Sequence, residues 1–144
     1  MPTKRLLYAK HSFCLQGVGF MGDKKKILVV EDEPHIIKLI SFILKSSGYD
    51  VIEAEIGAVG LKKAKAEKPD MIILDVMMPK MDGFEVAKKL KADPATRNIP
   101  ILMLSSKAQF EDKMKGIDSG ATDYITKPFD REELLQKIEE LLES

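Results

Sequence analysis

Residues 27–34 read Ile-Leu-Val-Val-Glu-Asp-Glu-Pro, an aliphatic run that passes into acidic residues and then a proline. A short aliphatic run bounded by polar residues is typical of a buried parallel strand. Pro34 suits the first turn of a helix, where the N–H that proline lacks would have no intrahelical partner. The stretch therefore predicts a buried strand that is followed closely by a helix.

The same alternation of strand and helix recurs along the rest of the chain. Short apolar runs predict five strands, at Ile27–Val30, Val51–Ala54, Met71–Leu74, Ile101–Leu104 and Thr122–Ile125. Apolar residues at helical spacing predict a helix from Pro34 to just before Gly48, three more near 58–67, 84–92 and 108–118, and a last one through Leu134–Leu142. In the helix near 84–92, Phe84, Ala87 and Leu90 are expected to face inward, and the pattern over 108–118 is the weakest.

Five strands that alternate with five helices predict a doubly wound α/β fold with a five-stranded parallel sheet. Ligands bind such folds at the carboxyl ends of the strands, where the strand order reverses. The fold by itself names no function. The residues that follow each predicted strand are therefore the ones to consider next.

Length and composition restrict the class of protein. The 144 residues suit one domain, and Lys plus Arg equals Asp plus Glu at 23 each, which gives no electrostatic reason to expect nucleic-acid or membrane binding. No apolar run approaches the roughly 18 residues of a membrane helix. The single cysteine, Cys14, is compatible with a reducing compartment, so we expect a cytoplasmic protein.

Residues 1–21 differ from the rest of the chain. They show no clear helix or strand period, carry Lys4, Arg5 and Lys10 without an acidic residue, and end at Met21, which resembles a second start. We expect a poorly ordered extension or a start-site artefact, with a docking or targeting arm as the alternative. The folded domain is expected to span residues 22–144.

Carboxylates, a hydroxyl and a lysine follow four of the five predicted strands. Glu31 and Asp32 follow the first, Asp75 the third, Ser105 the fourth, and Lys127 comes soon after the fifth. Three carboxylates at one rim repel one another, so at least one should have a raised pKa unless a cation neutralises them. Oxygen ligands of this kind suit Mg²⁺. An aspartate beside such a cation can attack phosphorus and form an acyl phosphate.

Four segments together resemble a known family. They are Leu28-Val29-Val30-Glu31-Asp32, Ile73-Leu74-Asp75-Val76-Met77-Met78-Pro79 with Met81-Asp82-Gly83, Leu104-Ser105-Ser106, and Asp123-Tyr124-Ile125-Thr126-Lys127-Pro128-Phe129. In this order they resemble the receiver domain of two-component response regulators, over about residues 24–142. The resemblance implies a flavodoxin-like sheet of order 2-1-3-4-5, as in single-domain chemotaxis regulators.

The resemblance also implies a role for each acidic residue. Asp75 matches the residue that accepts a phosphoryl group from a phosphohistidine on a sensor histidine kinase. Asp32 and Asp75 match direct Mg²⁺ ligands, Glu31 an acidic partner acting through water, and Met77 a ligand through its main-chain carbonyl. Lys127 matches the lysine that contacts the phosphoryl group. Such a protein phosphorylates and dephosphorylates only itself, so we expect no enzyme with a separate substrate.

A switch and its output follow from the same resemblance. Ser105 and Tyr124 match a pair in which the hydroxyl moves toward the phosphoryl group and the ring turns inward, and the Lys127–Pro128 peptide bond is expected to be cis. The output is expected to be binding of an unknown downstream protein by the surface of the fourth helix, fifth strand and fifth helix. A monomer is expected without phosphorylation, with dimerisation on phosphorylation left open.

Other interpretations of these residues exist. Glu31 and Asp32 could favour a helix N-terminus, Lys127 could form an ordinary salt bridge, and Tyr124 could be a packing residue. The chain could instead be the receiver half of a larger DNA-binding regulator, because the Asp123–Phe129 segment resembles receivers of that kind. An FMN-binding electron carrier is disfavoured, because the acidic residues 31–33 and Pro34 would repel the flavin phosphate and remove an amide donor.

Overall fold

The computed structural model describes residues 24–106 and 120–143. They form one parallel sheet of five strands in the order β2-β1-β3-β4-β5. The strands are β1 (Lys26–Val30), β2 (Asp50–Ala54), β3 (Met71–Asp75), β4 (Ile101–Ser106) and β5 (Asp123–Lys127). The predicted flavodoxin-like sheet and its strand order are therefore confirmed.

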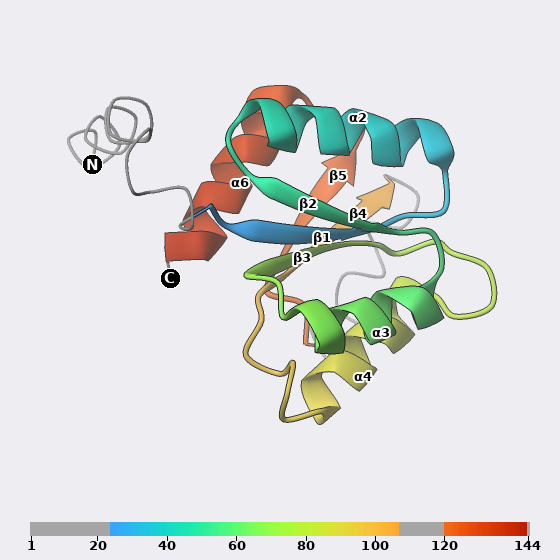
Figure 1. The fold of residues 1–144 in the computed structure, drawn as a ribbon. Helices are drawn as coiled ribbons and strands as arrows, with labels where there is room; N and C mark the ends of the chain where they lie inside the picture. The colour runs from blue at the N-terminus through green and yellow to red at the C-terminus, as the bar shows by residue number, and fades with distance from the viewer. Residues whose placement is uncertain (1–23, 107–119, 144) are drawn as a thin grey trace.

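Four helices cover the sheet in the described ranges, two on each face (Figure 1). They are α2 (Pro34–Ser46), α3 (Gly57–Glu67), α4 (Gly83–Ala92) and α6 (Arg131–Glu143). Helices α2 and α6 lie on one face, and α3 and α4 lie on the other. Our prediction of five helices is thus met only in part. The helix expected over 108–118, like the extension expected over 1–21, lies outside the described residues.

The alternation of side chains along the strands explains the two helical layers. Successive strand residues point to opposite faces, so a strand buried on both faces needs an unbroken apolar run. Ile27 and Val29 of β1 pack into the core beneath α2 and α6, while Leu28 and Val30 pack into the core beneath α3 and α4. All four side chains are essentially inaccessible to solvent. The aliphatic run in the sequence therefore supplies both halves of the core.

The helix ends follow local sequence signals. Pro34 occupies the first turn of α2, and Gly48 just beyond this helix has φ +94°, a left-handed conformation that favours glycine. The Asp82 carboxylate caps α4 by accepting a hydrogen bond from the Glu85 N–H at 3.0 Å. Ile56 precedes α3 in an extended conformation without a side-chain cap, and its side chain is exposed.

The predicted inward face of α4 is confirmed but incomplete, and one predicted strand boundary was wrong. Ala87 and Leu90 are buried and Phe84 packs partly buried against the core, while Val86, which was not predicted, is fully buried. Thr122 precedes β5 and does not belong to it; its N–H donates to the Ile101 carbonyl, and its hydroxyl accepts from the Ile101 N–H. Thr122 therefore joins β5 to the start of β4 partly through its side chain, which an apolar pattern cannot reveal.

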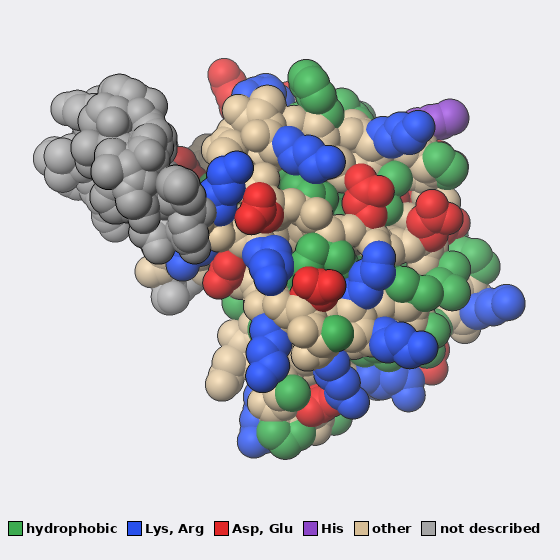
Figure 2. Space-filling view, in the orientation of Figure 1, with side chains coloured by type: hydrophobic (Ala, Val, Ile, Leu, Met, Phe, Trp, Pro, Cys, Tyr) green, Lys and Arg blue, Asp and Glu red, His purple; other side chains and the backbone are tan. Residues whose placement is uncertain are grey.

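Charged side chains of both signs are interspersed over the face that includes the edge strand β2 (Figure 2). Strand β2 contributes the exposed carboxylates of Asp50 and Glu53. Charges on an edge strand oppose its pairing with another sheet. Among the described helices, none combines the length and the apolar character that a membrane crossing requires.

Candidate functional site

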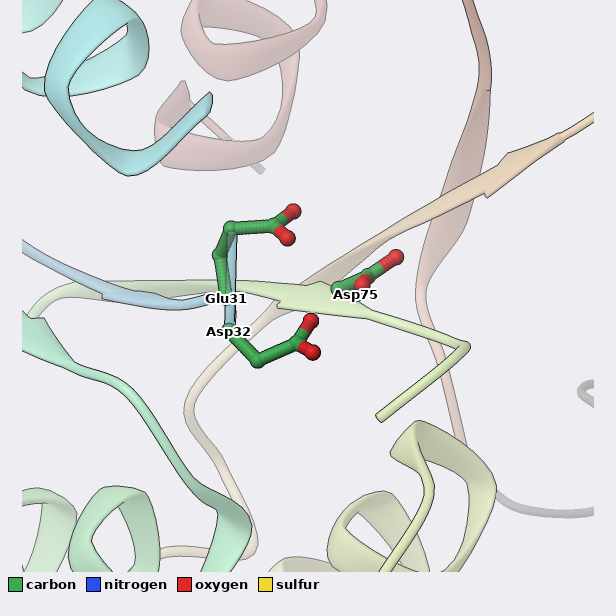
Figure 3. Close-up of side chains that lie close together, drawn as sticks. All are labelled: Glu31, Asp32 and Asp75. Carbon is green, nitrogen blue, oxygen red and sulfur yellow. The ribbon is translucent and has the colours of Figure 1, made fainter. Parts of the chain in front are cut away.

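The acidic residues meet where two neighbouring strands of the sheet end. Glu31 and Asp32 follow β1 directly, and Asp75 is the last residue of β3, the neighbour of β1 in the sheet. One carboxylate oxygen from each residue lies within 4.8 Å of the others. Figure 3 shows the three side chains projecting into the same space from the ends of these strands. The fold thus brings together residues that are more than forty positions apart.

Glu31 is completely buried, which is unusual for a carboxylate. Its Oε2 atom accepts a hydrogen bond from the Glu33 N–H at 3.0 Å, whereas Oε1 has no hydrogen-bond partner within the described structure. The pKa of Glu31 is raised to about 7, mainly because burial disfavours the charged form. The Glu33 N–H opposes this shift, and the charge of Asp75 adds to it.

Asp75 is also buried, with 2% of its surface exposed. Burial raises its pKa, while the nearby Lys127 ammonium and the Met77 N–H act in the opposite direction. Lys127 Nζ forms an ion pair with Asp75 Oδ1 at 3.1 Å.

The raised pKa values confirm the expectation from the three clustered carboxylates, with a different main cause. Repulsion between the acids was expected to raise at least one pKa. Burial is the larger cause for both Glu31 and Asp75, and the charges of neighbouring acids contribute less. The sequence places the acids together but does not show that two of them would lie beneath the surface.

Lys127 comes from β5, the edge strand farthest from β2 in the sheet. It is the last residue of β5 and lies opposite Ser106 of β4 in the strand register. Its Nζ is 3.1 Å from Asp75 Oδ1 and 3.5 Å from Glu31 Oε1. Burial lowers the pKa of Lys127, but the two carboxylates outweigh it and the net shift is upward. The Lys127–Pro128 peptide bond is cis.

Ser105 and Tyr124 lie on the same face of the sheet beside this cluster. Ser105 directly follows Leu104, the residue opposite Asp75, and Tyr124 is opposite Met103, two positions before Ser105. The Ser105 hydroxyl is buried and makes no hydrogen bond to the described residues. Tyr124 is half-buried against the core beneath α3 and α4, and burial raises the pKa of its phenol.

The donor set fits a hard divalent cation. Mg²⁺ prefers oxygen ligands and is usually held by one or two carboxylates. Asp32 is half-exposed at the edge of the cluster. Within the described structure, the buried oxygen atoms Glu31 Oε1 and Asp75 Oδ1 face the Lys127 ammonium and make no other polar contact. Three carboxylates against one ammonium leave negative charge at the site. The Met77 side chain is exposed, and the ligand role that the resemblance implies for its main-chain carbonyl stays a prediction.

A parallel sheet of this order, with an acidic cluster and a lysine at its carboxyl edge, defines a class of α/β signalling domain. The chain belongs to the response regulator receiver domain family, whose sequence profile matches residues 27–139. Receiver domains of this family accept a phosphoryl group as signalling modules and are not enzymes in the usual sense.

Curated relatives of two kinds are similar to this chain. It is 48% identical over 117 residues to the DNA-binding dual master transcriptional regulator RpaA of a Synechocystis species, covering 81% of this chain and 48% of RpaA. The chain therefore spans about half the length of that relative. It is 38% identical to protein PilH of Pseudomonas aeruginosa, covering 81% of this chain and 97% of PilH.

Solved structures give the same family. A response regulator from Chloroflexus aurantiacus superposes with a TM-score of 0.81 at 31% identity, covering 84% of this chain and 99% of that chain. The receiver domain of the sensor histidine kinase PA1611 from Pseudomonas aeruginosa has a TM-score of 0.78 at 30% identity, with coverage of 84% and 99%. That structure is described as having a magnesium ion coordinated in its active-site cleft.

Proposed function

We propose that this chain accepts a phosphoryl group on Asp75 from a phosphohistidine of a sensor histidine kinase, with Mg²⁺ held at the acidic cluster. The observation that carries the proposal is the buried Asp75 carboxylate, which lies within 4.8 Å of two further carboxylates and 3.1 Å from Lys127. In this proposal Asp32 and Asp75 hold the ion directly, Glu31 acts through water, and the Met77 carbonyl is a further ligand.

The chemistry follows from the groups around Asp75. A carboxylate oxygen of Asp75 attacks phosphorus, an O–P bond forms, and the N–P bond of phosphohistidine breaks, leaving its electron pair on the imidazole nitrogen. The Lys127 ammonium offsets negative charge on the transferring phosphoryl oxygens. Mg²⁺, when bound, supplies further positive charge at the same oxygens. No separate substrate is turned over.

The output of the phosphorylated protein is proposed to be binding. The Ser105 hydroxyl, which has no hydrogen-bond partner among the described residues, would donate a hydrogen bond to the new phosphoryl group, and Tyr124 would turn inward behind it. This change would bias the surface of β5 and α6 toward a downstream protein. The helix predicted over 108–118, which the sequence adds to this surface, lies outside the described residues. The sequence predicts a monomer before phosphorylation and leaves dimerisation afterwards open.

Intact-mass measurement tests the proposal. The purified chain is incubated with acetyl phosphate and Mg²⁺, and we expect a gain of one phosphoryl group that disappears when EDTA replaces Mg²⁺. Asp75→Asn should show no gain. Asp50→Asn, which changes an exposed aspartate at the other end of the sheet, should behave as the wild type. Equal gains in Asp75→Asn and the wild type would contradict the assignment of Asp75.

A second candidate is the receiver part of a longer DNA-binding regulator. It is favoured by the 48% identity to RpaA, of which this chain covers 48%. In that case the phosphorylated receiver would act on an attached DNA-binding domain, and this chain alone would contact no promoter. The length of the native open reading frame distinguishes the two candidates, since a DNA-binding domain must follow residue 144 in the second.

A further inference from the structure

Gly83, the first residue of α4, lies against the main chain of Asp75. Its N–H donates a hydrogen bond to the Val76 carbonyl at 2.9 Å. A Cβ atom added to Gly83 would be closest to the Asp75 carbonyl oxygen, at 2.8 Å from Val76 Cα and 3.0 Å from the Asp75 carbonyl carbon. Side-chain Cβ atoms essentially never approach other heavy atoms within 3.0 Å. Only glycine fits here without a shift of the backbone.

The contact at Gly83 differs from those of the other glycines in residues 24–106 and 120–143. A Cβ on Gly60 would first meet the Val30 side chain at 2.9 Å, and one on Gly57 would first meet the Val86 side chain at 2.8 Å. Side chains can relax by small rotations. Gly83 is the one position among them where every near atom belongs to the main chain, and that main chain is the Asp75–Val76 segment.

The elements on both sides of this contact are fixed. On the strand side, Asp75 pairs with Leu104 of β4, and the Val76 N–H donates to the Leu104 carbonyl at 3.0 Å. On the helix side, α4 buries Val86 and Ala87 completely in the core. Moving either element would break sheet hydrogen bonds or open the core, because protein interiors are closely packed. The turn over residues 76–82 is the part that can yield.

That turn contains a group that touches the phosphoacceptor. The Met77 N–H bonds to the Asp75 carboxylate and helps to lower its pKa. We propose that Gly83 is a positioning residue, whose missing side chain lets α4 close against the Asp75 main chain and so sets Asp75 and Met77 for cation binding and phosphoryl acceptance. This inference rests on the proposed function.

Gly83→Ala tests the inference, with Gly48→Ala as the control. Alanine is intrinsically better than glycine in a helix, so helix propensity alone predicts a more stable Gly83→Ala protein. Gly48 has φ +94° with no atom within 4 Å of an added Cβ, and it lies between α2 and β2 at the amino end of the sheet. Its substitution strains the backbone without any contact at the site.

Two readouts separate positioning from stability. The Kd of Mg²⁺ is measured by calorimetry without a phosphodonor, and the phosphorylation rate constant is measured with acetyl phosphate at saturating Mg²⁺. For Gly83→Ala we expect a Kd at least about tenfold weaker and a rate constant about 100-fold lower, the scale of a 1 Å misplacement. For Gly48→Ala both values should stay within about twofold of the wild type, although its denaturation midpoint falls.

The outcomes bear separately on the two proposals. A wild-type chain that gains no phosphoryl group would contradict the proposed function. A wild type that is phosphorylated, with a Gly83→Ala variant that matches it in both readouts, would overturn only the role of Gly83. A Gly83→Ala chain that stays unfolded even in sucrose, which favours compact states, would also overturn it, because the turn would then not absorb the contact.

Discussion

Asp32→Asn should make the metal-free protein more stable and the magnesium-loaded protein less stable than the wild type. The substitution keeps the shape of the side chain and removes one of three charges whose carboxylate oxygens lie within 4.8 Å of one another. At 4.8 Å two unit charges interact by about 0.9 kcal/mol in water and by about 3.5 kcal/mol at an effective dielectric constant of about 20. Asp32 is half-exposed, so the lower end of this range applies.

We therefore expect Asp32→Asn to raise the free energy of unfolding by about 1 kcal/mol in EDTA, a rise in Tm of about 4 °C. In Mg²⁺ at about 100 times its Kd, the wild type gains about 2.7 kcal/mol. The variant lacks a charged ligand and should gain less than about 1 kcal/mol at that concentration. The order of stability of the two proteins thus reverses between the two conditions.

Urea denaturation with and without Mg²⁺ measures both quantities, and Asp50→Asn is the matched control. Asp50 is an exposed carboxylate at the amino end of β2, 4.0 Å from Lys24, so its substitution should change stability by less than about 0.5 kcal/mol in either condition. An Asp32→Asn protein that loses stability in EDTA, or that gains as much from Mg²⁺ as the wild type, would refute the reasoning.

Three further substitutions are expected to act in different ways. Lys127→Met should leave the calorimetric Kd of Mg²⁺ unchanged or tighter, yet slow phosphorylation at least about tenfold, because the ammonium repels the cation but offsets phosphoryl charge; equal losses in both would argue against this. Ser105→Ala removes a buried hydroxyl without a hydrogen-bond partner in the described structure, so urea denaturation should show a fall in the free energy of unfolding of less than about 0.5 kcal/mol. A fall above about 1 kcal/mol would indicate that the hydroxyl does make a hydrogen bond. Leu102→Ala empties part of the fully buried core and should cost about 3 kcal/mol by the same assay, whereas a cost below about 1 kcal/mol would be inconsistent with the packing.

The sheet was predictable because its signal is local and strong. An aliphatic run such as Ile27–Val30 must be buried on both faces, and the alternation of such runs with helical patterns restricts the fold to a parallel α/β sheet. The carboxyl ends of β4 and β5 were harder to locate. Both strands continue into polar residues, since Ser106 pairs with Lys127 in the ladder, and hydrophobicity does not record such hydrogen bonding.

The residues of the site could be predicted from the sequence, but their burial and their contacts could not. The position of Glu31, Asp32 and Asp75 after neighbouring strands follows from the topology of the fold. The complete burial of Glu31, and its hydrogen bond from the Glu33 N–H, depend on how α2 begins and were not visible in the sequence. The contact of Gly83 with the Asp75 main chain likewise depends on distances that the sequence does not show.

Acyl phosphates can be trapped, which allows the phosphorylated residue to be located directly. The chain is phosphorylated with acetyl phosphate and Mg²⁺, reduced with borohydride so that an aspartyl phosphate becomes homoserine, and sequenced by tandem mass spectrometry. The account predicts homoserine at position 75 alone, and none when EDTA replaces Mg²⁺. Homoserine at another position, or the same yield without a divalent cation, would contradict the central claim that one pocket joins Asp75 to its metal site.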